Sequence, residues 1–298
     1  MPSAAFRSPS RLRSVFLPLI GAALATGHAQ SPSLTLTPAT VESGSPELIR
    51  VEAPTDGSPE GEWLGRKLQF FRGPSSRAWF ALAGVDVEAP AGPSSLKITA
   101  HQANGTRLDL SREVEIHPAH YKTGSLTVAP RFVEPGPDDQ ILIAAAIKAK
   151  EQAFATTAPD PLWSGSFIAP VSAPPTDSFG TRRMFNGKLA SIHKGMDFRA
   201  GTGTPVLAGN AGKVVLAQLL YYEGNCVMVD HGQGLMSISM HLSRIDVKPG
   251  QTVAKGQRLG LSGATGRVTG PHLHWAIRWQ GAMLDPAKLL RLDLQSLP

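Results

Sequence analysis

The sequence has 298 residues, 42% of them hydrophobic and 17% charged, which is typical of a globular protein with room for two domains. This composition excludes a disordered or membrane-embedded chain. Residues 31–164 carry 12 Lys and Arg against 16 Asp and Glu (net −4), whereas residues 165–298 carry 14 against 7 (net +7). A basic C-terminal half suits an anionic polymer as partner, and a merely solvated basic surface explains it equally well.

Residues 1–30 have the pattern of a signal peptide. Three arginines within residues 7–13 precede an apolar run over residues 15–26, and small residues follow as a cleavage site. The run is shorter than the roughly 18 to 20 residues of a spanning helix, so we expect a secreted mature chain without a membrane span rather than a retained anchor. In a secreted chain without aromatic-basic clusters, nucleic acid is not an expected partner.

Residues 31–125 predict a β-sandwich-like domain, because short alternating segments rich in β-branched residues are separated by turns. The predicted strands are Ser33–Thr37, Leu48–Glu52, Leu68–Phe71, Ala78–Leu82 and Ser95–Thr99. Residues 126–175 predict a connector with a helix at Asp138–Phe154 and a proline-rich exit. We expect its aromatic residues Trp163 and Phe167 to pack on the following domain rather than line its cleft.

Residues 176–298 predict an antiparallel β domain, so the fold class is mainly β. Glycine-punctuated strands are expected at Pro205–Ala208, Lys213–Ala217, Cys226–Val229, Leu235–His241, Gln257–Leu261 and Leu273–Trp279. Cys226 is the only thiol, which excludes an internal disulfide and a cysteine zinc site and predicts small buried filler. His231 lies in the connection Asp230–Gly234 and is interpreted as a turn residue.

One set of residues has the chemistry of a catalytic zinc site: His193, Asp197, His241, His272 and His274. Catalytic zinc sites use three nitrogen or oxygen ligands and leave one position open, and two imidazoles with one carboxylate match this pattern. His272 and His274 are two apart in a predicted strand, so both can face one cleft, one for metal and one for protons. No His-Glu-x-x-His motif is present, so the glutamate base of that motif is missing.

Local sequence suggests how these side chains are placed. Gly195 lies between His193 and Asp197 and argues for a loop that runs into a strand rather than a helix. His241 alternates with Ser237 and Ser239, and on this pattern it lies on the polar, cleft-facing side of its strand.

The C-terminal half contains a series of short motifs: Ser178–Gly187 (SFGTRRMFNG), His193–Asp197 (HKGMD), Gly201–Val206 (GTGTPV), Val229–Gly232 (VDHG), His241–Ser243 (HLS), Val247–Gly250 (VKPG) and Gly263–His274 (GATGRVTGPHLH). With these motifs, the segment 176–290 resembles the M23 metallopeptidase family, the lysostaphin and LytM type of cell-wall endopeptidase. The preceding part resembles the N-terminal β domain and connector of some bacterial members.

The resemblance implies a Zn²⁺ ion held by His193, Asp197 and His274, with His241 and His272 as catalytic residues whose individual roles stay open. It also implies hydrolysis of peptidoglycan cross-links, with D-Ala to diaminopimelate bonds favoured and a glycine bridge as the other option. The two-domain form points to the periplasm rather than the extracellular medium. No protein partner is indicated.

Two further interpretations stay open at this stage. Arg183 and Asn186 match a subset of the family and either line the groove as substrate-binding residues or hold the loop before His193. The alternative function is a non-catalytic wall-binding protein or an activator of a partner hydrolase, although such relatives lose zinc ligands and this chain keeps them all. A structural zinc ion is less suited to the residues, because structural sites favour cysteine.

Overall fold

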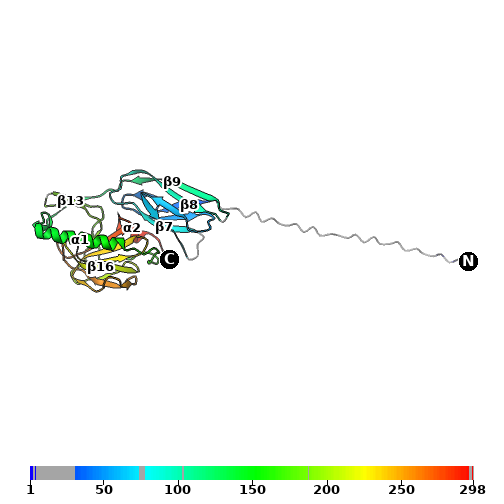
Figure 1. The fold of residues 1–298 in the computed structure, drawn as a ribbon. Helices are drawn as coiled ribbons and strands as arrows, with labels where there is room; N and C mark the ends of the chain where they lie inside the picture. Colours follow the sequence, from blue (N-terminus) through cyan, green and yellow to red (C-terminus); the bar gives the residue numbers. More distant parts are fainter. Residues whose placement is uncertain are drawn as a thin grey trace. The chain divides into compact units, whose positions relative to one another are not determined.

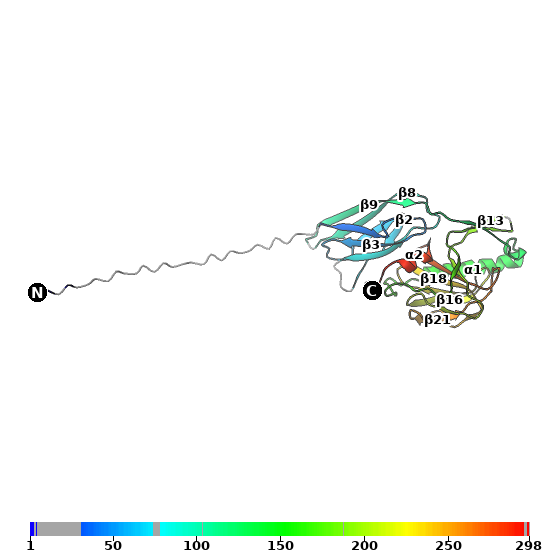
Figure 2. The ribbon, with the colours of Figure 1, turned by 180° about the vertical axis from the view of Figure 1, so that it is seen from behind.

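Two β-sheets form the N-terminal part of the described chain (Figures 1 and 2). The computed structural model describes residues 1–2, 4, 31–73, 78–102, 104–186, 188–294 and 297, so the predicted signal peptide lies almost wholly outside the described residues. One sheet has the order β1-β3-β7-β6 and the other the order β2-β9-β8-β4-β5. Their strands are β1 Ser33–Thr37, β2 Val41–Glu42, β3 Pro46–Glu52, β4 Glu60–Trp63, β5 Arg66–Leu68, β6 Phe71–Arg72, β7 Trp79–Gly84, β8 Gly92–His101 and β9 Arg107–His117.

The predicted strands of this region are confirmed with one exception. Leu68–Phe71 is not a single strand, because β5 ends at Leu68 and β6 begins at Phe71 in the other sheet. The chain therefore crosses between the two sheets at residues 69–70. Hydrophobic alternation predicts extended structure, but it carries no information about the sheet in which each half pairs.

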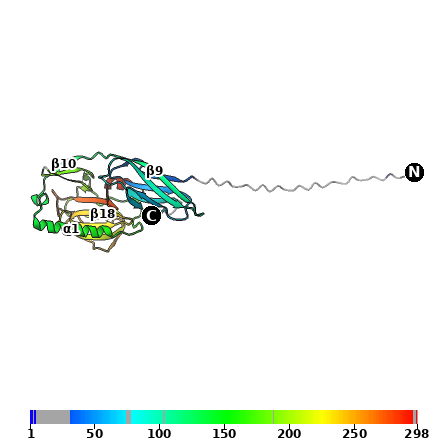
Figure 3. The same ribbon diagram turned by 45° about the horizontal axis from the view of Figure 1, so that its top comes forward.

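The helix α1 (Pro137–Ala155) follows a short strand, β10 (Thr123–Leu126), and a 3₁₀ turn at Pro130–Phe132. Pro137 occupies its first turn, and Asp138 and Asp139 there interact favourably with the helix dipole. Ala146 and Ala153 are buried against Leu216, Met228 and Ile238 of the C-terminal sheet. Small side chains let the helix lie close to that sheet, where it contacts β16, and Figure 3 shows α1 beside the part of the sheet that contains β18.

The C-terminal part contains an eight-stranded sheet with the order β11-β14-β22-β18-β17-β16-β20, in which β23 pairs with β22. Two three-stranded sheets accompany it, β15-β21-β19 and β10-β12-β13. The elements are β11 Pro175–Asp177, β12 Arg182–Phe185, β13 Lys188–Ile192, β14 Met196–Phe198, β15 Pro205–Leu207, β16 Gly212–Leu220, β17 Gly224–Asp230, β18 Leu235–Leu242, β19 Arg244–Ile245, β20 Thr252–Val253, β21 Arg258–Leu261, β22 Leu273–Trp279, β23 Ala282–Leu284 and α2 Pro286–Arg291. The mainly β prediction is confirmed.

A continuous hydrophobic core runs through residues 32–298, which form one compact unit. Trp163 and Phe167 of the predicted connector are buried in this core, as expected. Trp163 makes an edge contact with Phe71 of β6 at a ring-centroid distance of 5.5 Å, and Phe167 does the same with His231 at 5.1 Å. The connector therefore packs against both the N-terminal and the C-terminal β regions.

The boundaries 31–125, 126–175 and 176–298 stay a prediction. β10 pairs in parallel with β12, so a strand from before α1 completes a small sheet with strands that follow it. In the part of the chain that the structure describes, no helix has both the length and the apolar character needed to cross a bilayer.

Candidate metal centre and groove

Strand register places the candidate ligands on one face of the large sheet. Asp197 of β14 lies directly opposite His274 of β22, and His274 lies opposite Met240 of β18. Directly opposed residues of antiparallel strands project to the same face, so these three side chains form a row. Further along the same face, Ala276 and Ile238 are covered by α1. The helix thus closes one end of the face and leaves the other end to the polar residues.

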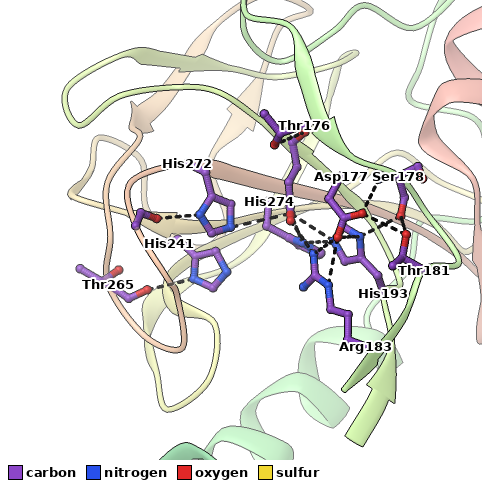
Figure 4. A network of polar contacts seen from close by, with 12 residues as sticks. Thr176, Asp177, Ser178, Thr181, Arg183, His193, His241, Thr265, His272 and His274 are labelled. Carbon is purple, nitrogen blue, oxygen red and sulfur yellow. Dashed lines mark hydrogen bonds and ion pairs between the residues drawn. The ribbon is translucent and has the colours of Figure 1, made fainter. Parts of the chain in front are cut away.

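The donor atoms of His193, Asp197 and His274 converge, and Figure 4 shows the rings of His193 and His274 close to each other. Asp197 Oδ1 lies 2.8 Å from His274 Nδ1 and 3.1 Å from His193 Nε2, and the two nitrogens are 3.0 Å apart. All three residues are buried. They form a candidate metal site, since each offers one ligand atom within 4.8 Å of the others.

The surrounding backbone orients the two histidine ligands. His193 Nδ1 lies 3.0 Å from the Ser178 carbonyl oxygen, to which it donates its proton, so Nε2 keeps its lone pair for the cluster. Gly195 packs against the ring of His274, and a Cβ there would lie 2.4 Å from Nε2. Any side chain at position 195 would therefore displace His274, which is why glycine interrupts the loop before β14.

Arg183 of β12 holds the carboxylate of Asp197 from the outside. Its Nη2 lies 2.5 Å from Asp197 Oδ2 and 2.7 Å from Asp177 Oδ2. Oδ2 of Asp197 is thereby occupied, and Oδ1 faces the histidines. Burial alone would raise the pKa of Asp197, but hydrogen bonds with His193 and His274 hold it well below its usual range. Asp197 is therefore an anion throughout the physiological pH range.

His241 and His272 face the same cluster from the opposite side (Figure 4). Their ring centroids are 4.9 Å apart, and His272 Nε2 lies 3.7 Å from Asp197 Oδ1. Each ring donates its Nδ1 proton to a backbone carbonyl, His241 to Thr265 at 2.9 Å and His272 to Gly270 at 2.8 Å. This tautomer leaves Nε2 of both rings as a proton acceptor.

Burial lowers the pKa of His241 to about 3 and that of His274 to about 4. Both imidazoles are therefore neutral at pH 7. A neutral ring can ligate a metal ion or accept a proton, and a protonated ring can do neither.

His241 reaches the groove by a route that differs from the predicted alternation. Ser237 and Ser239 are buried, and they pair across the ladder with the core residues Ile277 and Trp275. His241 instead has φ +63, which turns its side chain away from the serine face. This conformation costs on the order of 1–3 kcal/mol, which the bonds of its backbone N–H to Glu223 O and of its ring to Thr265 O help to offset.

One loop, residues 262–272, supplies both carbonyl partners of these histidines. It packs against the hairpin between β16 and β17, where Gly266 (φ +75) approaches Gly224 so closely that a Cβ would lie 2.4 Å from its backbone nitrogen. Thr265 Oγ1 accepts a hydrogen bond from Asn225 N and donates one to Leu242 O. The hairpin and the loop therefore support each other.

A groove of about 670 Å³ is lined by Arg183 and by the five predicted site residues, which are His193, Asp197, His241, His272 and His274. Its walls include Gly124 and Leu126 of β10, together with Tyr222, Glu223 and Arg267. Asn186 is exposed and does not line the groove in the part of the chain that the structure describes. Its amide exchanges two hydrogen bonds of 3.2 Å with the backbone of Val128, which is a lining residue.

His231 and Cys226 lie away from the groove, as expected. His231 is fully buried in the turn between β17 and β18, with Nδ1 2.7 Å from Ala211 O and Nε2 2.8 Å from Ser237 Oγ. Cys226 is fully buried, and burial raises the pKa of its thiol. Both ring nitrogens of His231 are engaged in hydrogen bonds, and Cys226 lacks the exposure of a reactive thiol, so neither belongs to the site.

Comparison with known proteins identifies the family. The model of peptidase family M23 matches residues 191–286. A crystal structure from Pseudomonas aeruginosa assigned to peptidase M23 is 30% identical, with a TM-score of 0.64, and the match covers 84% of this chain and 94% of that chain. The chain belongs to peptidase family M23. All five predicted site residues lie inside the segment matched by the M23 model, whereas Asp177 and Arg183 precede it.

Curated M23-type relatives share only part of their length with this chain. The peptidoglycan DD-endopeptidase ShyA of Vibrio cholerae is 44% identical over 114 residues, which are 38% of this chain and 26% of that protein. The DD-carboxypeptidase/endopeptidase Mpg of Neisseria meningitidis is 37% identical over 98 residues, 33% of this chain and 23% of that protein. The chain thus spans about a quarter of the length of these relatives.

Proposed function

We propose that this M23 protein is a zinc-dependent endopeptidase that hydrolyses peptide cross-links of peptidoglycan in the periplasm, at D-Ala to diaminopimelate bonds. The observation that carries the proposal is the groove, in which three convergent donors face two further histidines with free Nε2 atoms. The relatives named as peptidoglycan DD-endopeptidases support the substrate class.

The donor set fits zinc. Two imidazoles and one carboxylate are the ligand number and type of a catalytic zinc site, and His193 and Asp197 each have an outer hydrogen-bond partner, as zinc ligands usually do. A zinc ion would be held by His193, Asp197 and His274, where it would polarise the scissile carbonyl as a Lewis acid and activate a water molecule near neutral pH.

The chain's own residues then move protons. Nε2 of His241 and Nε2 of His272 both face the groove, so one can accept the proton of the attacking water and the other can protonate the leaving amine. Either can also donate to the developing oxyanion once it is protonated. Arg183 acts as a positioning residue, because it bonds Asp197 Oδ2 and directs Oδ1 inward.

The test is digestion of purified, cross-linked peptidoglycan by the zinc-loaded protein, with products identified by mass spectrometry. We expect cross-linked dimers to become monomers. His272→Ala should lower the rate about 10²- to 10⁴-fold, the usual contribution of a general acid or base, while zinc content stays the same. His120→Ala, an exposed histidine outside the groove, is the matched control. Wall binding without any release of monomers would favour the non-catalytic alternative.

A further inference from the structure

Among the charged groove residues that the structure describes, one forms no ion pair, although the carboxylate of Glu223 acts on it from a distance. Arg183 is paired with Asp177 and Asp197. Two other lining residues have partners outside the groove, Lys194 with Glu88 and Glu223 with Lys150. Arg267 also lines the groove, yet among the described residues it forms no ion pair and its side chain makes no hydrogen bond.

Arg267 is held in place by contacts that leave its hydrogen-bond donors unused. Its guanidinium carbon lies 4.6 Å from the ring centroids of both Phe185 and Tyr222. Its backbone N–H donates to Tyr222 O at 2.9 Å, and the preceding Gly266 allows the close approach to the hairpin. Aromatic rings contact the faces of a guanidinium, so its in-plane N–H groups stay available.

We propose that Arg267 forms a carboxylate-binding subsite of the groove and selects peptides that carry a free carboxylate next to the scissile bond. A planar guanidinium binds a carboxylate through two parallel hydrogen bonds, which add direction as well as affinity. The inference rests on the proposed function for the identity of the peptide, and it concerns which peptide the groove prefers.

The position of Arg267 in its loop couples this subsite to the reaction centre. Arg267 lies between Thr265 and Gly270, whose carbonyls orient His241 and His272. The loop that holds the two proton-transfer side chains therefore also presents the substrate anchor. A substrate carboxylate bound at Arg267 is placed at a set distance from both histidines.

Substrate chemistry shows what such a subsite would distinguish. In a D-Ala to diaminopimelate cross-link, the carbon that bears the scissile nitrogen also bears a carboxylate. The interior of a glycine bridge has no carboxylate, and amidation of diaminopimelate removes its charge. Arg267 therefore favours the free diaminopimelate cross-link over both others.

The experiment compares two cross-linked muropeptide dimers that differ only in whether this diaminopimelate carboxylate is free or amidated. We expect the wild-type protein to show about 10- to 100-fold higher kcat/KM for the free form, the value of a charge-assisted pair. Arg267→Ala should remove this preference, chiefly through KM, so that its loss of kcat/KM is about 10- to 100-fold larger on the free dimer than on the amidated dimer. Arg267→Lys should keep part of it, since it retains charge without the planar fork.

Arg182→Ala is the matched control, an exposed arginine on β12 that does not line the groove. This variant should have the same kcat/KM as the wild-type protein for both dimers. Equal losses of Arg267→Ala on the two dimers would mean that Arg267 only supports loop packing, and this outcome would overturn the proposal.

Binding of both dimers, measured by calorimetry, separates this inference from the proposed activity. Tighter binding of the free dimer that Arg267→Ala abolishes, without cleavage by any variant, would support the subsite and refute the enzyme. Cleavage of both dimers without a preference for the free carboxylate would support the enzyme and refute the subsite. Absence of a preference in both binding and cleavage overturns the subsite.

Discussion

The groove and the N-terminal sheet each bury a carboxylate, Asp197 and Glu47, but their surroundings act on the two in opposite directions. Asp197 is bonded by Arg183, His193 and His274, and its pKa is held well below the usual range. Glu47 accepts one hydrogen bond from Ser45 Oγ at 2.6 Å, while its Oε2 has no partner. Burial raises the pKa of Glu47 to about 8.

The contrast shows that the number of donors, rather than burial, decides whether a buried carboxyl is charged. In the N-terminal sheet, Glu47 is a protonated acid at neutral pH. In the groove, Asp197 is an anion, and its Oδ1, which Arg183 does not contact, faces the imidazoles of His193 and His274. Only the second arrangement is prepared for a cation.

Asp197→Asn should have the largest effect on the metal centre, because it removes the ligand charge and leaves a single oxygen for both the metal ion and Arg183. We expect zinc affinity to fall by more than the roughly 10- to 100-fold that is typical of losing an outer partner, and cleavage to be lost with it. Zinc content after dialysis against a chelator series measures this. Unchanged zinc content would remove Asp197 from the ligand set.

Arg183→Gln should have an intermediate effect. Loss of its bond to Asp197 Oδ2 frees the carboxylate to rotate, and we expect about 10- to 100-fold weaker zinc binding with KM little changed. Arg182→Gln, an exposed arginine next to it on β12, is the control and should bind zinc normally. A raised KM at unchanged zinc affinity would instead assign Arg183 to substrate binding.

Glu47→Gln should have the smallest effect on zinc binding and activity, but a clear effect on stability. The pKa of Glu47 in the folded protein, about 8, lies above its ordinary value of 4.5, so the folded chain retains a proton that the unfolded chain loses. The contribution of this group to wild-type stability therefore falls as the pH rises from about 4.5 to 8, by at most about 1.4 kcal/mol for each pH unit.

Denaturant unfolding at pH 5 and pH 8 measures this difference. The variant should gain stability relative to wild type at pH 8 and little at pH 5. Glu42→Gln is the control, because a hydrogen bond from Lys288 lowers the pKa of Glu42, and its loss should destabilise by less than about 1 kcal/mol. A Glu47→Gln effect that is the same at both pH values would mean that Glu47 is ionised when folded.

Much of the fold was predictable because its signals are local. The strand predicted at Leu273–Trp279 has those bounds as β22, and the helix predicted at Asp138–Phe154 extends by one residue at each end as α1. The strands β10, β12 and β13 were not predicted. All three are short, and β10 pairs with β12 across more than 50 residues of sequence, so local patterning carries no signal for this sheet.

The sequence predicted which residue types of the groove could ligate a metal ion. It did not predict the charged residues that surround them. Asp177, Glu223 and Arg267 were not singled out, because a single charged residue at a strand end, in a turn or in a loop has no local signal for what it faces. His241 was expected in the groove on the basis of alternation with Ser237 and Ser239, whereas the structure uses a positive φ instead. A left-handed histidine cannot be recognised from its neighbours.

The sequence by itself determined which side chains can ligate a metal ion and move protons, since imidazole and carboxylate chemistry is fixed by residue type and the motifs are contiguous. Only the tertiary structure decided which nitrogen of each histidine faces the groove, because the carbonyls of Ser178, Thr265 and Gly270 select the tautomer. Backbone carbonyls are chemically the same in every residue. Their choice of partner depends on how the loops approach each other in space.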